Sequence, residues 1–167
     1  HRIKKILLSS SRAVYGEGKY IDIDENWFFP KKRDVSSLDE GNFDFQSFNP
    51  IATDEDSEIN PLSLYSLTKY NQEQVTMLMG KTLNIPVISL RYQNVYGPGQ
   101  SLSNPYTGIL SVFSTRLLNN NDLEIYEDGN QSRDFIYIDD VVDATTLALE
   151  KNDELSYVLN VGCGKPI

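Results

Sequence analysis

The stretch Asn84-Ile-Pro-Val-Ile-Ser-Leu-Arg-Tyr92 joins two contrasting sequence patterns. Before it, residues 65–83 contain one glycine and no proline, which predicts a long helix. The proline of the stretch ends that helix, and the apolar run that follows predicts a buried strand. Gly97-Pro-Gly99 then closes the strand with a turn. A helix followed at once by a buried strand is the repeating unit of α/β proteins.

The same alternation continues on both sides of this unit. It predicts an α/β fold with a largely parallel sheet. The polar segment from Gly16 to Pro61 is interpreted as a long surface loop, and Asp139-Asp140 as the cap of the last helix. The remaining predicted strands are residues 3–11, 123–126, 134–138 and 157–161, and the remaining helices are residues 108–118 and 141–149.

Composition narrows the function classes. The net charge of −9 and the pI near 4.5 argue against binding to nucleic acid or to acidic membranes, which requires a basic face. Cys163 is the only cysteine, which excludes an internal disulfide and a cysteine-rich zinc site. No apolar run approaches the roughly 20 residues of a membrane span, and no signal peptide is visible. We expect a soluble, reduced, cytoplasmic protein without a metal site.

Tyr65 and Lys69 are the best candidates for proton-transfer chemistry. Residues four apart share one helix face, so both side chains can reach one small molecule. Ser11, at the end of the first predicted strand, can add a hydroxyl to this pair. The only histidine is His1, at the terminus, so the sequence offers no internal histidine for proton transfer by an imidazole. The alternative for Tyr65 is an amphipathic surface tyrosine.

Four motifs in this order resemble the extended short-chain dehydrogenases/reductases. Within that family the chain is similar to the NAD-dependent nucleotide-sugar epimerases, typified by UDP-glucose 4-epimerase, and residues 100–108 resemble those of dTDP-L-rhamnose 4-epimerases. The resemblance covers nearly every residue except the loop from Lys19 to Ala52. The motifs are Ser9-Ser-Ser-Arg-Ala-Val-Tyr-Gly16, Tyr65-Ser-Leu-Thr-Lys69, Leu90-Arg-Tyr-Gln-Asn-Val-Tyr-Gly-Pro98 and Arg133-Asp-Phe-Ile-Tyr-Ile-Asp-Asp140.

The resemblance implies that the chain is incomplete at both ends. The family begins with a strand, a Gly-x-x-Gly-x-x-Gly turn and a helix N-terminus that bind the NAD pyrophosphate. This sequence contains no such turn. Residues 1–99 would then be the second half of a Rossmann-type NAD-binding domain. Residues 100–167 would mostly belong to a small α/β substrate-binding domain, with elements that return to the Rossmann domain.

The resemblance also implies an enzyme that inverts C4 of a nucleotide-diphosphate sugar through a 4-keto intermediate. Tyr65 would take the C4 hydroxyl proton, and Ser11 would hydrogen-bond the same oxygen. A free tyrosine is protonated at neutral pH, and the charge of Lys69 favours the phenolate. NAD would contact Ser9, Tyr65, Lys69 and Tyr92, with Lys69 on the nicotinamide ribose. The alternative for Tyr92 is a packed core aromatic.

Further residues carry over from the resemblance as substrate ligands. Asn94 and Arg133 would bind the diphosphate, where a guanidinium suits the phosphate oxygens. Asn104 and Tyr126 would line the nucleotide pocket. The alternative for Arg133 is a surface ion pair. Gln93 stands where 4-epimerases commonly have phenylalanine, so the resemblance does not determine which sugar is bound.

Three functional alternatives follow. Sugar 4,6-dehydratases need an Asp-Glu pair where this chain has Arg12 and Ala13, which favours an epimerase. Reductases and decarboxylases on the same scaffold stay open. The missing glycine-rich turn supports a non-catalytic piece that binds a partner chain without NAD. For the epimerase we expect a homodimer.

Overall fold

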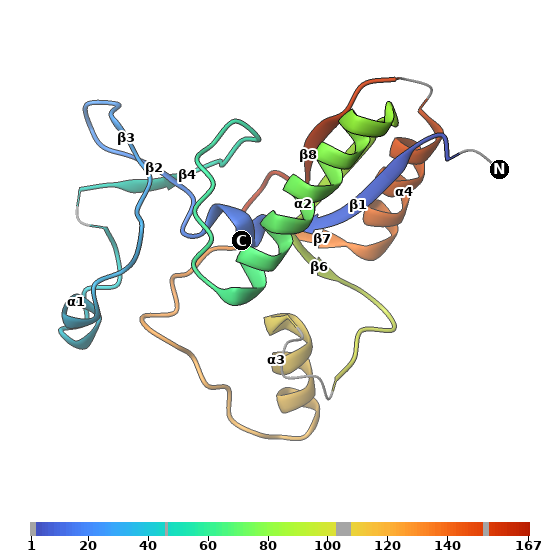
Figure 1. Ribbon diagram of the computed structural model, residues 1–167. Helices are drawn as coiled ribbons and strands as arrows, with labels where there is room; N and C mark the ends of the chain where they lie inside the picture. Colours follow the sequence, from blue (N-terminus) through green and yellow to red (C-terminus); the bar gives the residue numbers. More distant parts are fainter. Residues whose placement is uncertain (1–2, 46, 103–107, 152–153) are drawn as a thin grey trace.

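A computed structural model describes residues 3–45, 47–102, 108–151 and 154–167 (Figure 1). At its centre lies a parallel sheet in the order β1-β5-β8. Tyr92 is paired with Ser11 on one side and with Val161 on the other, so the three strands end together at one edge. The predicted α/β class with a parallel sheet is confirmed. These strands are β1 (Ile6–Ser11), β5 (Val87–Tyr92) and β8 (Tyr157–Val161).

The other elements surround this sheet. The 3-10 helix η1 follows β1 directly, and β6 and β7 form a short parallel pair. The helices are η1 (Arg12–Tyr15), α1 (Val35–Asp39), α2 (Leu64–Leu83), α3 (Ile109–Leu118) and α4 (Ile138–Glu150), and the strands are β2 (Lys19–Ile21), β3 (Trp27–Phe28), β4 (Asn49–Ile51), β6 (Asn94–Tyr96) and β7 (Phe135–Tyr137).

Helices α2 and α4 cover opposite faces of the sheet, as Figure 1 shows. Successive side chains of a strand point to opposite faces, which separates the residues of β5 into two sets. Ile88 and Leu90 join the hydrophobic core with Val141 of α4. On the other face, Gly80 of α2 lies so close to β5 that an added Cβ would be 2.3 Å from Cγ2 of Val87. Glycine therefore permits the close approach of α2 to the sheet.

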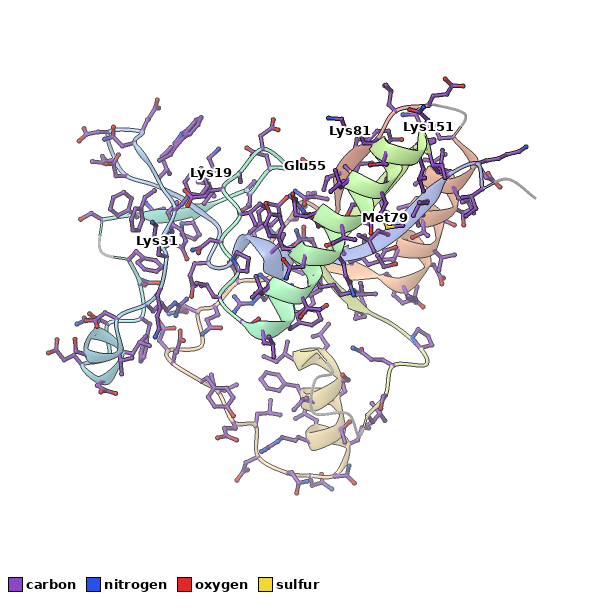
Figure 2. All side chains as sticks on the ribbon, viewed as in Figure 1. Lys19, Lys31, Glu55, Met79, Lys81 and Lys151 are labelled. Carbon is purple, nitrogen blue, oxygen red and sulfur yellow. The ribbon has the colours of Figure 1, made fainter. Side chains whose placement is uncertain are left out.

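The N-terminal ends of β1, β5 and β8 lie at the end of the sheet away from η1, β6 and β7 (Figure 1). Figure 2 shows Lys81 of α2 and Lys151, which follows α4, near that end of the sheet. The opposite, carboxyl edge faces η1, β6 and β7 (Figure 1). In open α/β sheets ligands bind outside the carboxyl ends of the strands, so this edge is the place to examine for a site.

The predicted surface loop is wrong for residues 19–45 and 47–51, which form a lobe with its own sheet in the order β3-β2-β4. Four aromatic rings hold the lobe together. Phe45 lies 5.1 Å from Tyr20 and 5.7 Å from Phe28, and Phe28 lies 4.6 Å from Phe48, between ring centroids. Such edge and tilted contacts are favourable for aromatic rings. In the sequence these four aromatic residues are separated by polar residues, so no local pattern indicated that they form a cluster.

Two other sequence predictions are corrected. Residues 123–126 form no strand, and Ile125 and Tyr126 are 54% and 70% exposed, so they lack a packed surface that would hold a strand. The cap predicted at Asp139 and Asp140 lies instead inside the first turn of α4, because that helix starts directly after β7. Their charges still favour the positive end of the helix dipole.

Candidate active site

The first turn of α2 places Tyr65 beside the carboxyl edge of the sheet. Helix α2 begins at Leu64 because Ser63 and Ser66 cap it reciprocally. The Ser63 hydroxyl accepts from the Ser66 backbone N–H at 3.1 Å, and the Ser66 hydroxyl accepts from the Ser63 N–H at 2.9 Å. Tyr65 is 57% exposed and makes no hydrogen bond with the described part of the chain. Its hydroxyl is therefore available to a ligand.

A cavity of about 410 Å³ brings four of the predicted residues together. Its walls include Ser11 at the end of β1, Tyr65 of α2, Tyr92 at the end of β5, and Asn94. These residues come from separate segments that converge at the carboxyl edge of the sheet. We call this space the Tyr65 cavity.

Lys69 lies one helical turn after Tyr65 and reaches the same strand end. Its Nζ donates a hydrogen bond to the backbone oxygen of Ser9 at 3.1 Å. An ammonium group has three N–H donors, and the described residues accept from one of them, which leaves two for a ligand. The Ser11 hydroxyl accepts from the Ala13 N–H at 3.2 Å and keeps its own proton as a donor.

Tyr92 makes a hydrogen bond that the sequence did not indicate, and it also packs against the core. Its hydroxyl lies 2.9 Å from Oγ1 of Thr145 on α4, and Ser9 makes a longer contact with it at 3.5 Å. The ring is half-buried against the hydrophobic core. Tyr92 thus combines a wall position in the cavity with the packed role that was its alternative.

The structure distributes the predicted substrate ligands over two spaces. Asn94 donates from Nδ2 to the backbone oxygen of Asp134 at 2.9 Å, and within the described part of the chain its amide oxygen accepts no hydrogen bond. Arg133 lines a neighbouring hollow of about 450 Å³, and Gln93 lines both spaces. Tyr126 is exposed and is absent from the walls of the Tyr65 cavity. Asn104 lies outside the described residues.

A buried polar network that the sequence prediction missed holds α2 against the sheet. Arg91 of β5 donates to both carboxylate oxygens of Glu73 on α2, with Nη2–Oε2 at 2.7 Å and Nε–Oε1 at 3.0 Å. Ser10 also donates to Glu73, and Arg91 donates to the Tyr15 hydroxyl at 2.7 Å. Burial lowers the pKa of Arg91, but the hydrogen bonds with Glu73 and Tyr15 outweigh it and raise that pKa overall.

The signal for this network was present in the spacing. Glu73 follows Lys69 by four residues, so Tyr65, Lys69 and Glu73 share one helix face. A carboxylate on the face turned toward the sheet requires a buried cation. Glu73 and Arg91 are 1% and 4% exposed.

Other site types find no support in the described ranges. No three His, Cys, Asp or Glu side chains gather there in a way that could hold a metal ion. No helix in these ranges is long and apolar enough to cross a membrane.

The sequence matches the model of the NAD dependent epimerase/dehydratase family over residues 44–162. It is 40% identical to dTDP-L-rhamnose 4-epimerase of Burkholderia thailandensis over 98% of this chain and 45% of the relative. It is 33% identical to dTDP-D-glucose 4,6-dehydratase of Dictyostelium discoideum over 97% of this chain and 32% of the relative. The chain belongs to the NAD dependent epimerase/dehydratase family, as the motifs predicted. It spans less than half the length of the curated relatives that it matches.

Solved structures agree with this assignment. UDP-N-acetylglucosamine 4-epimerase of Methanobrevibacter ruminantium, in complex with UDP-N-acetylmuramic acid, superposes with a TM-score of 0.72 at 30% identity, over 99% of this chain and 43% of that chain. UDP-glucuronic acid 4-epimerase of Bacillus cereus, in complex with UDP-glucuronic acid and NAD, superposes with a TM-score of 0.70 at 27% identity, over 100% of this chain and 42% of that chain.

Proposed function

We propose that the protein is an NAD-dependent epimerase that inverts C4 of a nucleoside-diphosphate sugar through a 4-keto intermediate. The observation that carries this proposal is the convergence of Ser11 and Tyr65 on one cavity, while Lys69 reaches the same strand end. The names of the relatives support the reaction and the substrate class. We propose Ser11, Tyr65 and Lys69 as the catalytic set.

The residues at this edge fit one part of the cofactor. Bound NAD would accept the C4 hydrogen with its electron pair and return it to the other face of the sugar. Two free N–H donors of Lys69 and the exposed hydroxyl of Tyr65 suit the hydroxyls of the nicotinamide ribose. We place Ser9 and Tyr92 beside the same group. The chain carries no glycine-rich turn, so residues outside it would hold the pyrophosphate.

Each side chain has a distinct task on the substrate. Tyr65 takes the C4 hydroxyl proton as the 4-keto group forms and returns it when the alcohol is restored. Lys69 holds its positive charge and its N–H donors at the same strand end, and Ser11 donates to the C4 oxygen. Asn94, on the wall of the cavity, binds the substrate through its amide oxygen, and Arg133 binds its diphosphate.

We further propose that residues 1–99 belong to the NAD-binding domain and residues 100–167 mostly to the substrate-binding portion. The pairing of β8 with β5 supports the return of the last strand to the NAD-binding sheet. We place the protein in the cytoplasm because the lone Cys163 allows no internal disulfide.

The proposal is tested by incubating the natural polypeptide with dTDP-L-rhamnose or UDP-glucose and following the H4 resonance by proton NMR. An epimerase yields the C4 epimer without net reduction of NAD. A 4,6-dehydratase would instead accumulate a 4-keto-6-deoxy sugar, although Arg12 and Ala13 replace its acid–base pair. Failure to retain NAD or to turn over any nucleotide sugar would support the non-catalytic alternative.

We propose a homodimer formed by the outer side of α2. Leu67, Val75, Leu78 and Met79 lie at helical spacing on α2 and are 45%, 58%, 66% and 50% exposed. A second copy can cover this apolar stripe. Leu78→Lys is expected to convert the dimer to a monomer in light scattering coupled to size exclusion.

The control for this variant is Leu155→Lys. Leu155 is 69% exposed and lies outside α2, so the charge should leave the dimer mass unchanged. A monomeric natural protein, or a Leu78→Lys variant that remains a dimer, would refute the α2 interface.

A further inference from the structure

One arginine of the lobe joins three segments that lie far apart in the sequence. Arg33 stands two residues before α1. Its Nη1 donates to both carboxylate oxygens of Glu127, at 2.8 and 3.0 Å, and Glu127 belongs to the segment between α3 and β7. Its Nε donates to Glu17, just after η1, at 3.3 Å. The lobe is therefore tied through one guanidinium to η1 and to the segment that leads into β7.

This ion-pair cluster is largely shielded from water. The side chains of Arg33, Glu17 and Glu127 are 22%, 23% and 23% exposed. Burial lowers the pKa of Arg33, but Glu17 and Glu127 outweigh it and raise that pKa overall. Charges that are mostly covered are screened less than exposed surface pairs, and contact with both carboxylate oxygens adds directional specificity.

The backbone that carries Arg33 is itself anchored. Asn60 donates from Nδ2 to the backbone oxygens of Pro30 at 3.0 Å and Lys31 at 3.3 Å. The backbone N–H of Asn60 donates in turn to the Val14 oxygen of η1 at 2.9 Å. Pro30 is fully buried. Arg33 thus projects from a fixed support beside the helix that follows Ser11.

The segment that Arg33 holds has little other attachment. Residues 125–132 are exposed, and apart from the Arg33 contact they make no hydrogen bond or ion pair, among the described residues, to a segment outside 125–133. Glu127 has a φ of 57°, in the left-handed region that a residue with a Cβ rarely adopts. Such a conformation persists only where surrounding contacts hold it, and here Arg33 supplies the contact.

The held segment leads directly to a proposed substrate ligand. Arg33, Glu127 and Arg133 line one hollow of about 400 Å³ between the lobe and this segment. Tyr126, which the sequence analysis places on the nucleotide, is the neighbour of Glu127 in the chain. The conformation at Glu127 therefore determines how Tyr126 and Arg133 are presented to a ligand.

We propose that Arg33 is a positioning residue which, through Glu127, holds residues 125–132 in the conformation that accepts the nucleotide of the substrate. This inference rests on the proposed function and gives the lobe a task in it, although none of the four family motifs contains a lobe residue. Without the contact the segment would occupy several conformations. The apparent affinity for the nucleotide falls by the fraction of molecules that remain competent to bind it.

The test compares Arg33→Met and Glu127→Met with Lys32→Met in the natural polypeptide. Lys32 is the matched control, because it is exposed and makes no ion pair within the described part of the chain. Calorimetric titration with UDP and dTDP should show binding weakened by about 3- to 30-fold in the first two variants, as expected for loss of a charged hydrogen bond that is partly exposed. Lys32→Met should bind as the natural protein does. In turnover, KM should rise with kcat nearly constant.

Limited digestion with chymotrypsin measures the segment itself. Cleavage after Tyr126, followed by mass spectrometry, should be faster in Arg33→Met and Glu127→Met and unchanged in Lys32→Met. The double variant Arg33→Met with Glu127→Met should match either single variant in both measurements, because the two residues act as one contact. If Arg33→Met fails to fold, Glu127→Met carries the test, since it alters only an exposed segment.

The outcomes separate positioning from a merely structural role. Unchanged cleavage after Tyr126, or unchanged UDP and dTDP affinity, would overturn the proposal even if the melting temperature fell. Losses that add in the double variant would overturn it as well, because Arg33 would then not act through Glu127. Faster cleavage together with weaker nucleotide binding in a protein without epimerase activity would uphold the role of Arg33 and refute only the proposed function.

Discussion

Replacing Tyr65 with Phe is expected to lower kcat for C4 inversion by about 10²- to 10⁴-fold, the usual contribution of a general base. The substitution removes one oxygen atom, and that oxygen makes no hydrogen bond with the described residues. Because the side chain is 57% exposed, the free energy of unfolding should change by less than about 0.5 kcal/mol. The H4 signal in NMR measures turnover, and urea unfolding measures stability.

Tyr70→Phe is the matched control for this experiment. Tyr70 lies on α2 as well, but it is absent from the walls of the Tyr65 cavity. Its variant should retain full turnover. If Tyr65→Phe kept more than about a tenth of the natural kcat, Tyr65 could not be the base, since even a modest general base contributes more.

The central elements of the fold could be predicted because their signals are local. The apolar run of β5 and the uninterrupted helix pattern of α2 each lie within one short stretch. The Tyr65 cavity followed from the same information. Strand ends bring Ser11 and Tyr92 to one edge of a parallel sheet, and a fixed spacing places Lys69 one turn after Tyr65.

Features that depend on distant partners could not be predicted in this way. The lobe of residues 19–45 and 47–51 depends on contacts among rings such as Phe28 and Phe45, which no periodic pattern marks. Arg133 was predicted to meet the phosphates, but its closeness to Arg12 arises only when η1 and the segment before β7 meet. The spacing of Glu73 places it on the helix face turned toward the sheet, but its pairing with Arg91, 18 residues away on β5, depends on which face of β5 is covered by α2.

Replacing Glu73 with Ala is expected to destabilise the fold by about 3–5 kcal/mol, the cost of removing one member of a buried ion pair. Arg91 would then remain 4% exposed without a carboxylate, and Ser10 would lose its acceptor. Gln72→Ala is the control, because Gln72 lies on α2 but is exposed. Helix propensity changes little in either variant, so the difference between their urea midpoints isolates the buried pair.

The double variant Glu73→Met with Arg91→Met distinguishes an ion-pair effect from a packing effect. Replacing both charges with apolar side chains of similar volume is often neutral, so the double variant should recover most of the loss. A double variant as unstable as Glu73→Ala would mean that the wider network with Ser10 and Tyr15 carries the stability. In either case Glu73 joins α2 to β1 and β5, the strands that end at Ser11 and Tyr92. Its loss should therefore also loosen the placement of Tyr65 relative to Ser11 and reduce kcat in the fraction that stays folded.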